Sequence, residues 1–213
     1  MIKRQALLLA AIAAGLSMTP AMAEPAGTWT VGVGVGHVEP DSDNGNLDKS
    51  SFGNIKVDHI DSDVRPTITG EYFVADNVGI EVLAALPFHH DIIIDVPGVG
   101  MTEAKTQLLP PTVSLQYHFD NLHAKVKPFI GVGANYTTFF KERSGVPGVD
   151  LDIDDSWGVA GHAGIDFKIN NTDAVRLDAR YIDLEPDVEL NGEKAGTAKI
   201  NPWVYGISYV QRF

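Results

Sequence analysis

The side chains that could take part in chemistry are histidines, aspartates and a serine spread along the chain. The histidines are His37, His59, His89, His90, His118, His123 and His162. No two of them stand at a metal-ligand spacing with a carboxylate to match, so we interpret them as structural or solvated. Asp150, Asp152 and Asp154 alternate as calcium ligands could, but Asp155 stands where an EF-hand loop requires glycine. The sequence therefore predicts no bound metal and no cofactor.

Ser156, His162 and Asp166 are the candidates for a nucleophile, a base and an acid. They share one face of a segment of alternating polarity. At about 3.3 Å per residue, the serine and the histidine would lie about 20 Å apart along a strand, far outside hydrogen-bonding reach. We therefore expect a protein that is not an enzyme.

The composition excludes several other classes of protein. The 213 residues include 28 acidic and 16 basic side chains, which give a net charge of −12. Nucleic-acid binding needs a basic surface that displaces counterions from the phosphates, so no nucleic-acid partner is expected. The chain has no cysteine, and its 21 glycines and 12 prolines disfavour a helical bundle. An all-β fold fits these numbers best.

Residues 1–23 have the pattern of a secretory signal peptide. Lys3 and Arg4 precede an apolar run, and Ala21, Met22 and Ala23 form a small-x-small cleavage site. The run is shorter than the ~20 apolar residues that cross a bilayer as a helix. We expect cleavage after residue 23, so that residues 24–213 form a single exported domain, for which the segments described next predict an outer-membrane β-barrel.

Eight segments of alternating polarity follow, each about as long as a tilted strand that crosses a bilayer. They span residues 28–38, 64–74, 79–88, 106–119, 126–140, 156–169, 174–184 and 200–213. The connections between them are alternately long and short. Successive strands of an up-and-down barrel turn at opposite ends, whereas a β-sandwich has no reason to alternate in this way. The sequence predicts an all-β, eight-stranded antiparallel up-and-down transmembrane β-barrel.

The two faces of these segments differ in polarity. One face is apolar, with aromatic rings near the segment ends, as at the two interfaces of a membrane. The other face carries charged residues, among them Glu71, Glu81, Arg176 and Arg180, which can pair inside a barrel but not in lipid. This second face is predicted to line the lumen. Eight strands enclose only enough room for side chains, so no open porin channel is expected.

Several runs of sequence resemble the OmpW/AlkL family of outer-membrane barrels. They are residues 79–88 (GIEVLAALPF), 109–112 (LPPT), 128–140 (PFIGVGANYTTFF) and 201–205 (NPWVY). The resemblance covers essentially the whole chain after residue 23, although the long connections match poorly. It implies an integral protein of the Gram-negative outer membrane that takes up small hydrophobic molecules passively and releases them sideways into the lipid.

The resemblance also implies that the barrel-assembly machinery reads the C-terminal strand, which ends in Phe213. Two positions depart from the family pattern. Gln211 stands where a tyrosine is common, and Arg180 takes an inward position that is often a bulky aromatic in relatives. An apolar gate would then depend mainly on Leu83, which we expect to form a small constriction above the charged lumen residues.

Prolines gather on three neighbouring segments, at Pro66, Pro87, Pro110 and Pro111. Proline has no N–H and cannot complete a β-ladder, so the wall is expected to be bulged or unpaired there. A hydrophobic molecule could leave the upper lumen through this part of the wall. The alternative is that these prolines only end their strands near the rim.

The long connections are predicted to face outside, and the termini and short turns to face the periplasm. The long connections span residues 39–63, 89–105, 141–155 and 185–199, which together hold 19 acidic and 7 basic side chains. They could share divalent cations with lipopolysaccharide phosphates, or form a solvated acidic rim. The rival function is a structural or receptor barrel whose salt-bridged interior allows no passage.

Overall fold

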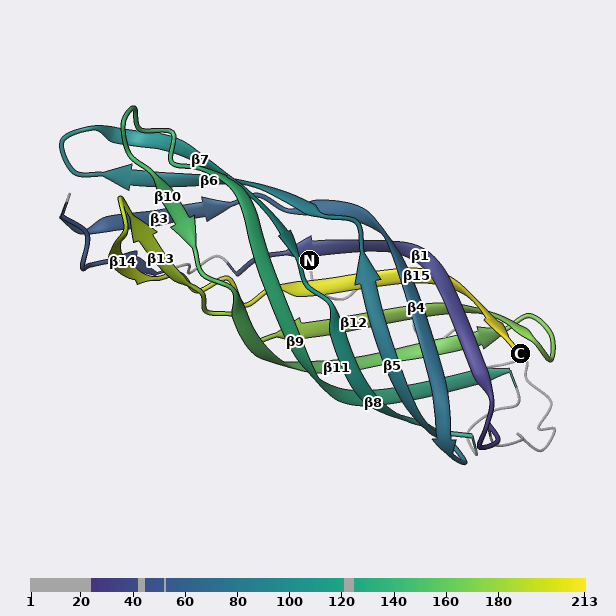
Figure 1. The fold of residues 1–213 in the computed structure, drawn as a ribbon. Coiled ribbons are helices and arrows are strands. Elements are labelled where there is room, and N and C mark those ends of the chain that lie inside the picture. Colours follow the sequence, from purple (N-terminus) through teal and green to yellow (C-terminus); the bar gives the residue numbers. More distant parts are fainter. Residues whose placement is uncertain (1–23, 42–44, 52, 121–124) are drawn as a thin grey trace, which may run out of the picture.

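The computed structural model describes residues 24–41, 45–51, 53–120 and 125–213; the predicted leader, residues 1–23, and His123 lie outside the described residues. Eight antiparallel strands close into a barrel (Figure 1). They are β1 (Trp29–Glu39), β4 (Asp63–Ala75), β5 (Val78–Ala85), β8 (Thr112–His118), β9 (Val126–Arg143), β11 (Ser156–Lys168), β12 (Asp173–Ile182) and β15 (Trp203–Arg212). Each pairs with the next, and β15 closes the barrel against β1. The predicted fold class is confirmed.

The alternating sequence places apolar side chains on the outside of the barrel, where they are exposed in the isolated molecule. Aromatic rings pair across strands near the ends of this apolar belt. Trp29 and Tyr72 lie 4.7 Å apart between ring centroids at the end of the barrel where Phe213 is hydrogen-bonded to Trp29. Tyr136 and Trp157 lie 4.8 Å apart at the opposite end. Two aromatic girdles around an apolar belt are typical of a transmembrane barrel. The described residues contain no helix that is long and apolar enough to span a membrane.

The end of the barrel opposite Trp29 and Phe213 is extended by further strands. They are β2 (Asn46–Leu47), β3 (Ile55–Ile60), β6 (Phe88–Val96), β7 (Gly100–Leu109), β10 (Leu151–Ile153), β13 (Asp187–Leu190) and β14 (Glu193–Thr197). Figure 1 shows the β6–β7 hairpin and β10, β13 and β14 projecting together beyond the barrel. We call this part the extension. The sequence was expected to form long loops here, but the connections form strands because their apolar residues share one core.

The apolar core of the protein lies in the extension and in the adjoining ends of β1, β11, β12 and β15. Its buried members include Leu47, Ile55, Val57, Phe88, Leu108, Val188 and Ile200. The outer surface of the extension carries ion pairs: Lys105 pairs with Asp91 at 3.1 Å between neighbouring strands β7 and β6. This surface therefore belongs in water, above the apolar belt.

Candidate functional site

The lumen of the barrel is filled by a buried ionic network, which we call the plug. Arg176 on β12 donates from Nε and Nη2 to the carboxylate of Asp166 at 2.7 and 2.9 Å. The same guanidinium reaches Glu81 at 2.9 Å and Glu71 at 3.3 Å. Its Cζ lies 4.4 Å from the ring centroid of Phe129. Because Arg176 is only 2% exposed and its partners come from β4, β5 and β11, it holds three parts of the wall together across the lumen.

A second arginine completes the plug on the side nearer the extension. Arg180 donates to Glu81 at 2.6 Å and to Nδ1 of His162 at 3.1 Å. Guanidinium nitrogens only donate, so Nδ1 of His162 accepts. The other ring nitrogen, Nε2, faces Asp178 at 3.2 Å and therefore carries the proton that it donates there. These two contacts fix the orientation of the His162 ring between Arg180 and Asp178.

The glycine at position 79 makes room for the plug. A Cβ at Gly79 would lie 2.1 Å from Oε1 of Glu71. That carboxylate also binds Nε2 of His118 at 2.7 Å, on the side away from Arg176. Any larger residue on β5 at this point would displace Glu71 from both partners.

The structure thus brings together Glu71, Glu81, Arg176 and Arg180, the four charged lumen residues chosen from the sequence. The alternation also placed Asp166 on the inward charged face. It did not assign His118 and His162 to this network, although their inward positions on alternating strands were the signal that could have done so. Neither His162 nor Asp166 is hydrogen-bonded to Ser156; both belong to the plug.

Leu83 lies on the extension side of the plug. It is half-buried, points into the lumen and lines a small cavity with Arg180 and His162. It is also the last residue of β5 to pair with β8, opposite Thr112.

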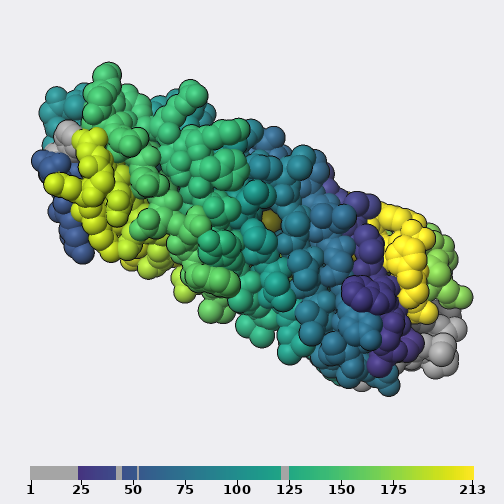
Figure 2. Space-filling view, viewed as in Figure 1, coloured from purple at the N-terminus to yellow at the C-terminus, as the bar shows by residue number. Residues whose placement is uncertain are grey.

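Beyond Leu83 the wall of the barrel is interrupted. The β5–β8 ladder ends at Leu83 and Thr112, and the ladder resumes between β6 and β7 at Phe88 and Leu108. Between these two pairs, four residues, 84–87, face three residues, 109–111, so the register shifts by one. We call this unpaired stretch the wall gap. Figure 2 shows a small opening in the surface between the blue and the teal parts of the wall, where these strands meet.

Three of the four prolines chosen from the sequence lie at the wall gap. Leu86 donates its N–H to the carbonyl oxygen of Pro66 on β4. Successive backbone nitrogens of a strand point to opposite sides, so the nitrogen of Pro87 points away from β4 and into the wall gap. Pro110 and Pro111 form the other side, where the side-chain amide of Asn135 donates to both of their carbonyls at 3.2 Å. Pro66 lies within the paired part of β4, opposite Val35.

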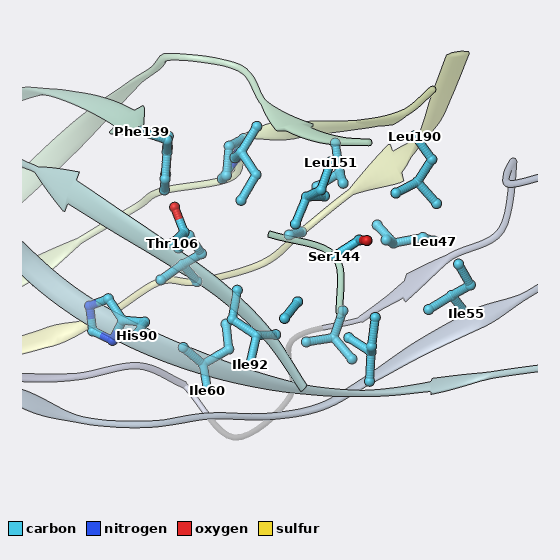
Figure 3. Close-up of a pocket in the computed structure, with 18 of the residues that line it drawn as sticks. Leu47, Ile55, Ile60, His90, Ile92, Thr106, Phe139, Ser144, Leu151 and Leu190 are labelled. Carbon is cyan, nitrogen blue, oxygen red and sulfur yellow. The ribbon is translucent and has the colours of Figure 1, made fainter. Parts of the chain in front are cut away.

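Above the plug and beside the wall gap, the extension encloses an apolar pocket of about 60 Å³, which we call the vestibule. Its walls come from β2, β3, β6, β7, β9, β10 and β13. The labelled side chains in Figure 3 include Leu47, Ile55, Ile60, Ile92, Phe139, Leu151 and Leu190. Among the few polar residues at its wall, Ser144 has its hydroxyl bonded to the carbonyl of Val149 at 2.7 Å. An apolar lining with a few polar groups is the composition of a binding site for small apolar molecules.

The apolar belt, the aromatic girdles and the polar lumen define a class of protein, the eight-stranded transmembrane β-barrel. Residues 25–213 match the family model described as the OmpW family. The chain belongs to the OmpW family, which consists of outer-membrane barrel proteins of Gram-negative bacteria and not of enzymes.

Individual relatives agree with this assignment. Outer membrane protein W of Vibrio cholerae serotype O1 is 32% identical over 220 residues, which cover 99% of this chain and 100% of that protein. The crystal structure of the outer membrane protein OprG from Pseudomonas aeruginosa has a TM-score of 0.73 and 29% identity, covering 89% of this chain and 97% of that chain. Outer membrane protein AlkL of Ectopseudomonas oleovorans is 28% identical over 131 residues, 61% of this chain and 56% of that protein. The outer-membrane location predicted from the sequence is confirmed.

Proposed function

We propose that the protein mediates passive uptake of small hydrophobic molecules, which enter the vestibule and leave sideways through the wall gap into the outer membrane. The observation that carries the proposal is the position of the vestibule. Its lining is almost entirely apolar, and it includes Leu108, whose pairing with Phe88 marks the edge of the wall gap. The resemblance to the OmpW/AlkL family also supports uptake of hydrophobic molecules.

The plug favours a sideways route over a route along the barrel axis. A molecule moving along the axis would have to separate Arg176 from Asp166 and Arg180 from Glu81, which are all nearly inaccessible to solvent. Breaking a buried ion pair costs about 3–5 kcal/mol. A sideways step into lipid leaves the plug intact and keeps the molecule in apolar surroundings throughout. Leu83, at the lumen side of the gap, is the proposed gate.

The prolines account for the gap in this proposal. Pro87, Pro110 and Pro111 have no N–H to offer across it, so the ladder cannot form without a change of sequence. We infer that Pro66 contributes only by ending the tight pairing of β4 with β5. We also infer that residues 1–23 are removed on export and that the strand ending in Phe213 is presented to the barrel-assembly machinery.

The test is to obstruct the lumen side of the gap. Ala85 is half-buried, points inward beside the gap and is small, so Ala85→Trp should block the passage. Val82→Trp is the matched control, because Val82 lies three residues earlier and faces lipid. We expect Ala85→Trp to lower the protein-dependent uptake of a small aromatic hydrocarbon by cells, and Val82→Trp to leave it unchanged. Equal uptake by parent and Ala85→Trp would refute the lateral route.

The alternative function is a structural or surface-receptor barrel without transport. The density of ion pairs in the plug favours it, since the lumen itself offers no passage. Under this alternative, cells with the protein would take up hydrophobic substrates no faster than cells without it, and the two tryptophan variants would behave alike.

A further inference from the structure

One buried polar atom at the wall of the vestibule has no hydrogen-bond partner among the described residues. His90 on β6 is 2% exposed and lies opposite Thr106 on β7 in a pocket whose other walls are almost entirely apolar. Its Nδ1 lies 2.6 Å from the carbonyl oxygen of Asp61. Its Nε2 is buried and has no hydrogen-bond partner in the part of the chain that the structure describes.

The hydrogen bond to Asp61 fixes which nitrogen carries the proton. A carbonyl oxygen only accepts, so Nδ1 of His90 is the donor. Burial lowers the pKa of His90, and the ring is therefore neutral near pH 7. In a neutral imidazole with the proton on Nδ1, Nε2 carries a lone pair. The unpartnered atom is thus an acceptor, and only a hydrogen-bond donor can satisfy it.

This requirement distinguishes between classes of small molecule. Hydrocarbons cannot satisfy the acceptor, and ethers, ketones and carboxylates present acceptors themselves. An O–H or N–H group can donate to it, and the bond would form in apolar surroundings where a missing partner is costly. The neighbouring hydroxyl of Thr106 makes only one long contact, 3.4 Å to the carbonyl of Gln107. The hydroxyl of Thr106 is therefore itself only weakly hydrogen-bonded.

His90 lies where a molecule would pass from the vestibule to the wall gap. Figure 3 shows His90 at the same end of the vestibule as Thr106 and Phe139, opposite Leu47 and Leu190. This is the end nearer the barrel, because β9 continues from Phe139 directly into its pairing with β8. His90 also follows Pro87 by three residues, so it lies beside the wall gap.

We propose that Nε2 of His90 binds the donor group of the permeant, so that the preferred substrates are small hydrophobic molecules with one O–H or N–H at the end of an apolar body, such as alkylphenols. This inference rests on the proposed uptake function and narrows its substrate class. It assigns to His90 the role of a specificity-determining residue.

The test compares three molecules of nearly the same size. p-Cresol has a hydroxyl donor, p-xylene has a methyl group in its place, and 4-methylanisole has only an acceptor. Binding is measured by NMR on the folded protein in lipid nanodiscs, with the histidine side chains labelled with ¹⁵N. We expect p-cresol to shift the Nε2 resonance of His90 and to bind about fivefold more tightly than p-xylene, the value of one net hydrogen bond. 4-Methylanisole should bind no more tightly than p-xylene.

Two variants separate the hydrogen bond from general effects. His90→Phe keeps a ring of similar size and removes the acceptor. In this variant p-cresol should no longer bind more tightly than p-xylene, and the affinity for p-xylene should be unchanged. His89→Phe is the matched control, because the adjacent His89 is exposed on the other face of β6 and should leave the advantage unchanged. Heat-modifiable migration in gels checks that each variant is folded. Equal binding of p-cresol and p-xylene by the parent, or an unchanged advantage in His90→Phe, would overturn the proposal.

Uptake into cells distinguishes failure of this inference from failure of the proposed function. If uptake of both p-cresol and p-xylene depends on the protein but His90→Phe leaves their ratio unchanged, the selection by His90 is wrong and the uptake function stands. If neither molecule enters faster with the protein than without it, the uptake function is wrong, and the role of His90 in uptake is wrong with it.

Discussion

Removing Arg176 should destabilise the barrel strongly, because this side chain compensates three carboxylates at once. We consider Arg176→Met, which keeps an unbranched side chain against the ring of Phe129 and removes the charge. After the change, Glu81 keeps Arg180 at 2.6 Å and Glu71 keeps His118 at 2.7 Å. Asp166 keeps only Nδ1 of His118, at 3.9 Å.

The magnitude follows from these remaining contacts. Removing one partner of a buried ion pair costs about 3–5 kcal/mol, since the other charge stays buried without compensation. Two of the three carboxylates keep a close partner, so most of the loss should fall on Asp166. Asp166→Asn in the same background should therefore recover at least about 1–3 kcal/mol, because an unsatisfied buried polar group costs about that much and a charged group costs more. The double variant thus tests the location of the loss as well as its size.

The assay is equilibrium unfolding by urea in lipid vesicles, followed by tryptophan fluorescence. Lys105→Met is the control, because the side chain of Lys105 is half exposed and its ion pair with Asp91 should contribute nothing measurable. A loss in Arg176→Met below about 1 kcal/mol would refute the reasoning, because an exposed pair behaves in that way. A loss that Asp166→Asn fails to reduce would contradict the assignment of the uncompensated charge.

Three other predictions concern the gate, the topology and His90. Leu83→Asp should lower uptake of hydrophobic molecules while heat-modifiable migration is kept, since an inward polar residue costs far less than one facing lipid, and unchanged uptake would exclude Leu83 as the gate. A cysteine introduced by Ser50→Cys should react with a membrane-impermeant maleimide in intact cells, and reaction only after permeabilisation would reverse the topology. Burial lowers the pKa of His90, so between that value and about 6.5 the unfolded chain binds more protons than the folded protein. The free energy of unfolding should therefore fall as the pH is lowered through this window, and an equal pH dependence in His90→Phe would contradict the assignment.

The barrel could be predicted from the sequence because its strands obey a simple two-residue period. The period is strong in every segment because one face of each strand meets lipid and the other carries charges. A shift of the register by one residue would turn Val31, Val33 and Val35 away from the membrane. The same period placed Glu71, Glu81, Arg176 and Arg180 on the inner face. Which of these side chains meet could not be predicted, since Arg176 lies 95 residues from Glu81 and contacts it across the lumen.

The extension was predicted poorly for a physical reason. Its strands are short, and their apolar residues pack against partners from distant connections, so the segment around Ile55 shows little regularity until β6 and β13 are placed beside it. The one-residue register shift at the wall gap was also invisible. The prolines indicated where the ladder fails, but only the pairing of Phe88 with Leu108 shows that residues on the two sides differ in number.

The long sequence separations within the plug have a consequence for assembly. Arg176 binds Glu71 and Glu81 across 105 and 95 residues, and Arg180 binds Glu81 across 99. In a partly inserted sheet that holds β4 and β5 but lacks β12, both glutamates would face the membrane interior without their cations, a state that is costly in lipid. Insertion should therefore be cooperative, with early intermediates kept at the water interface until β12 arrives. The ion pairs of the plug therefore favour the complete barrel over partly inserted sheets.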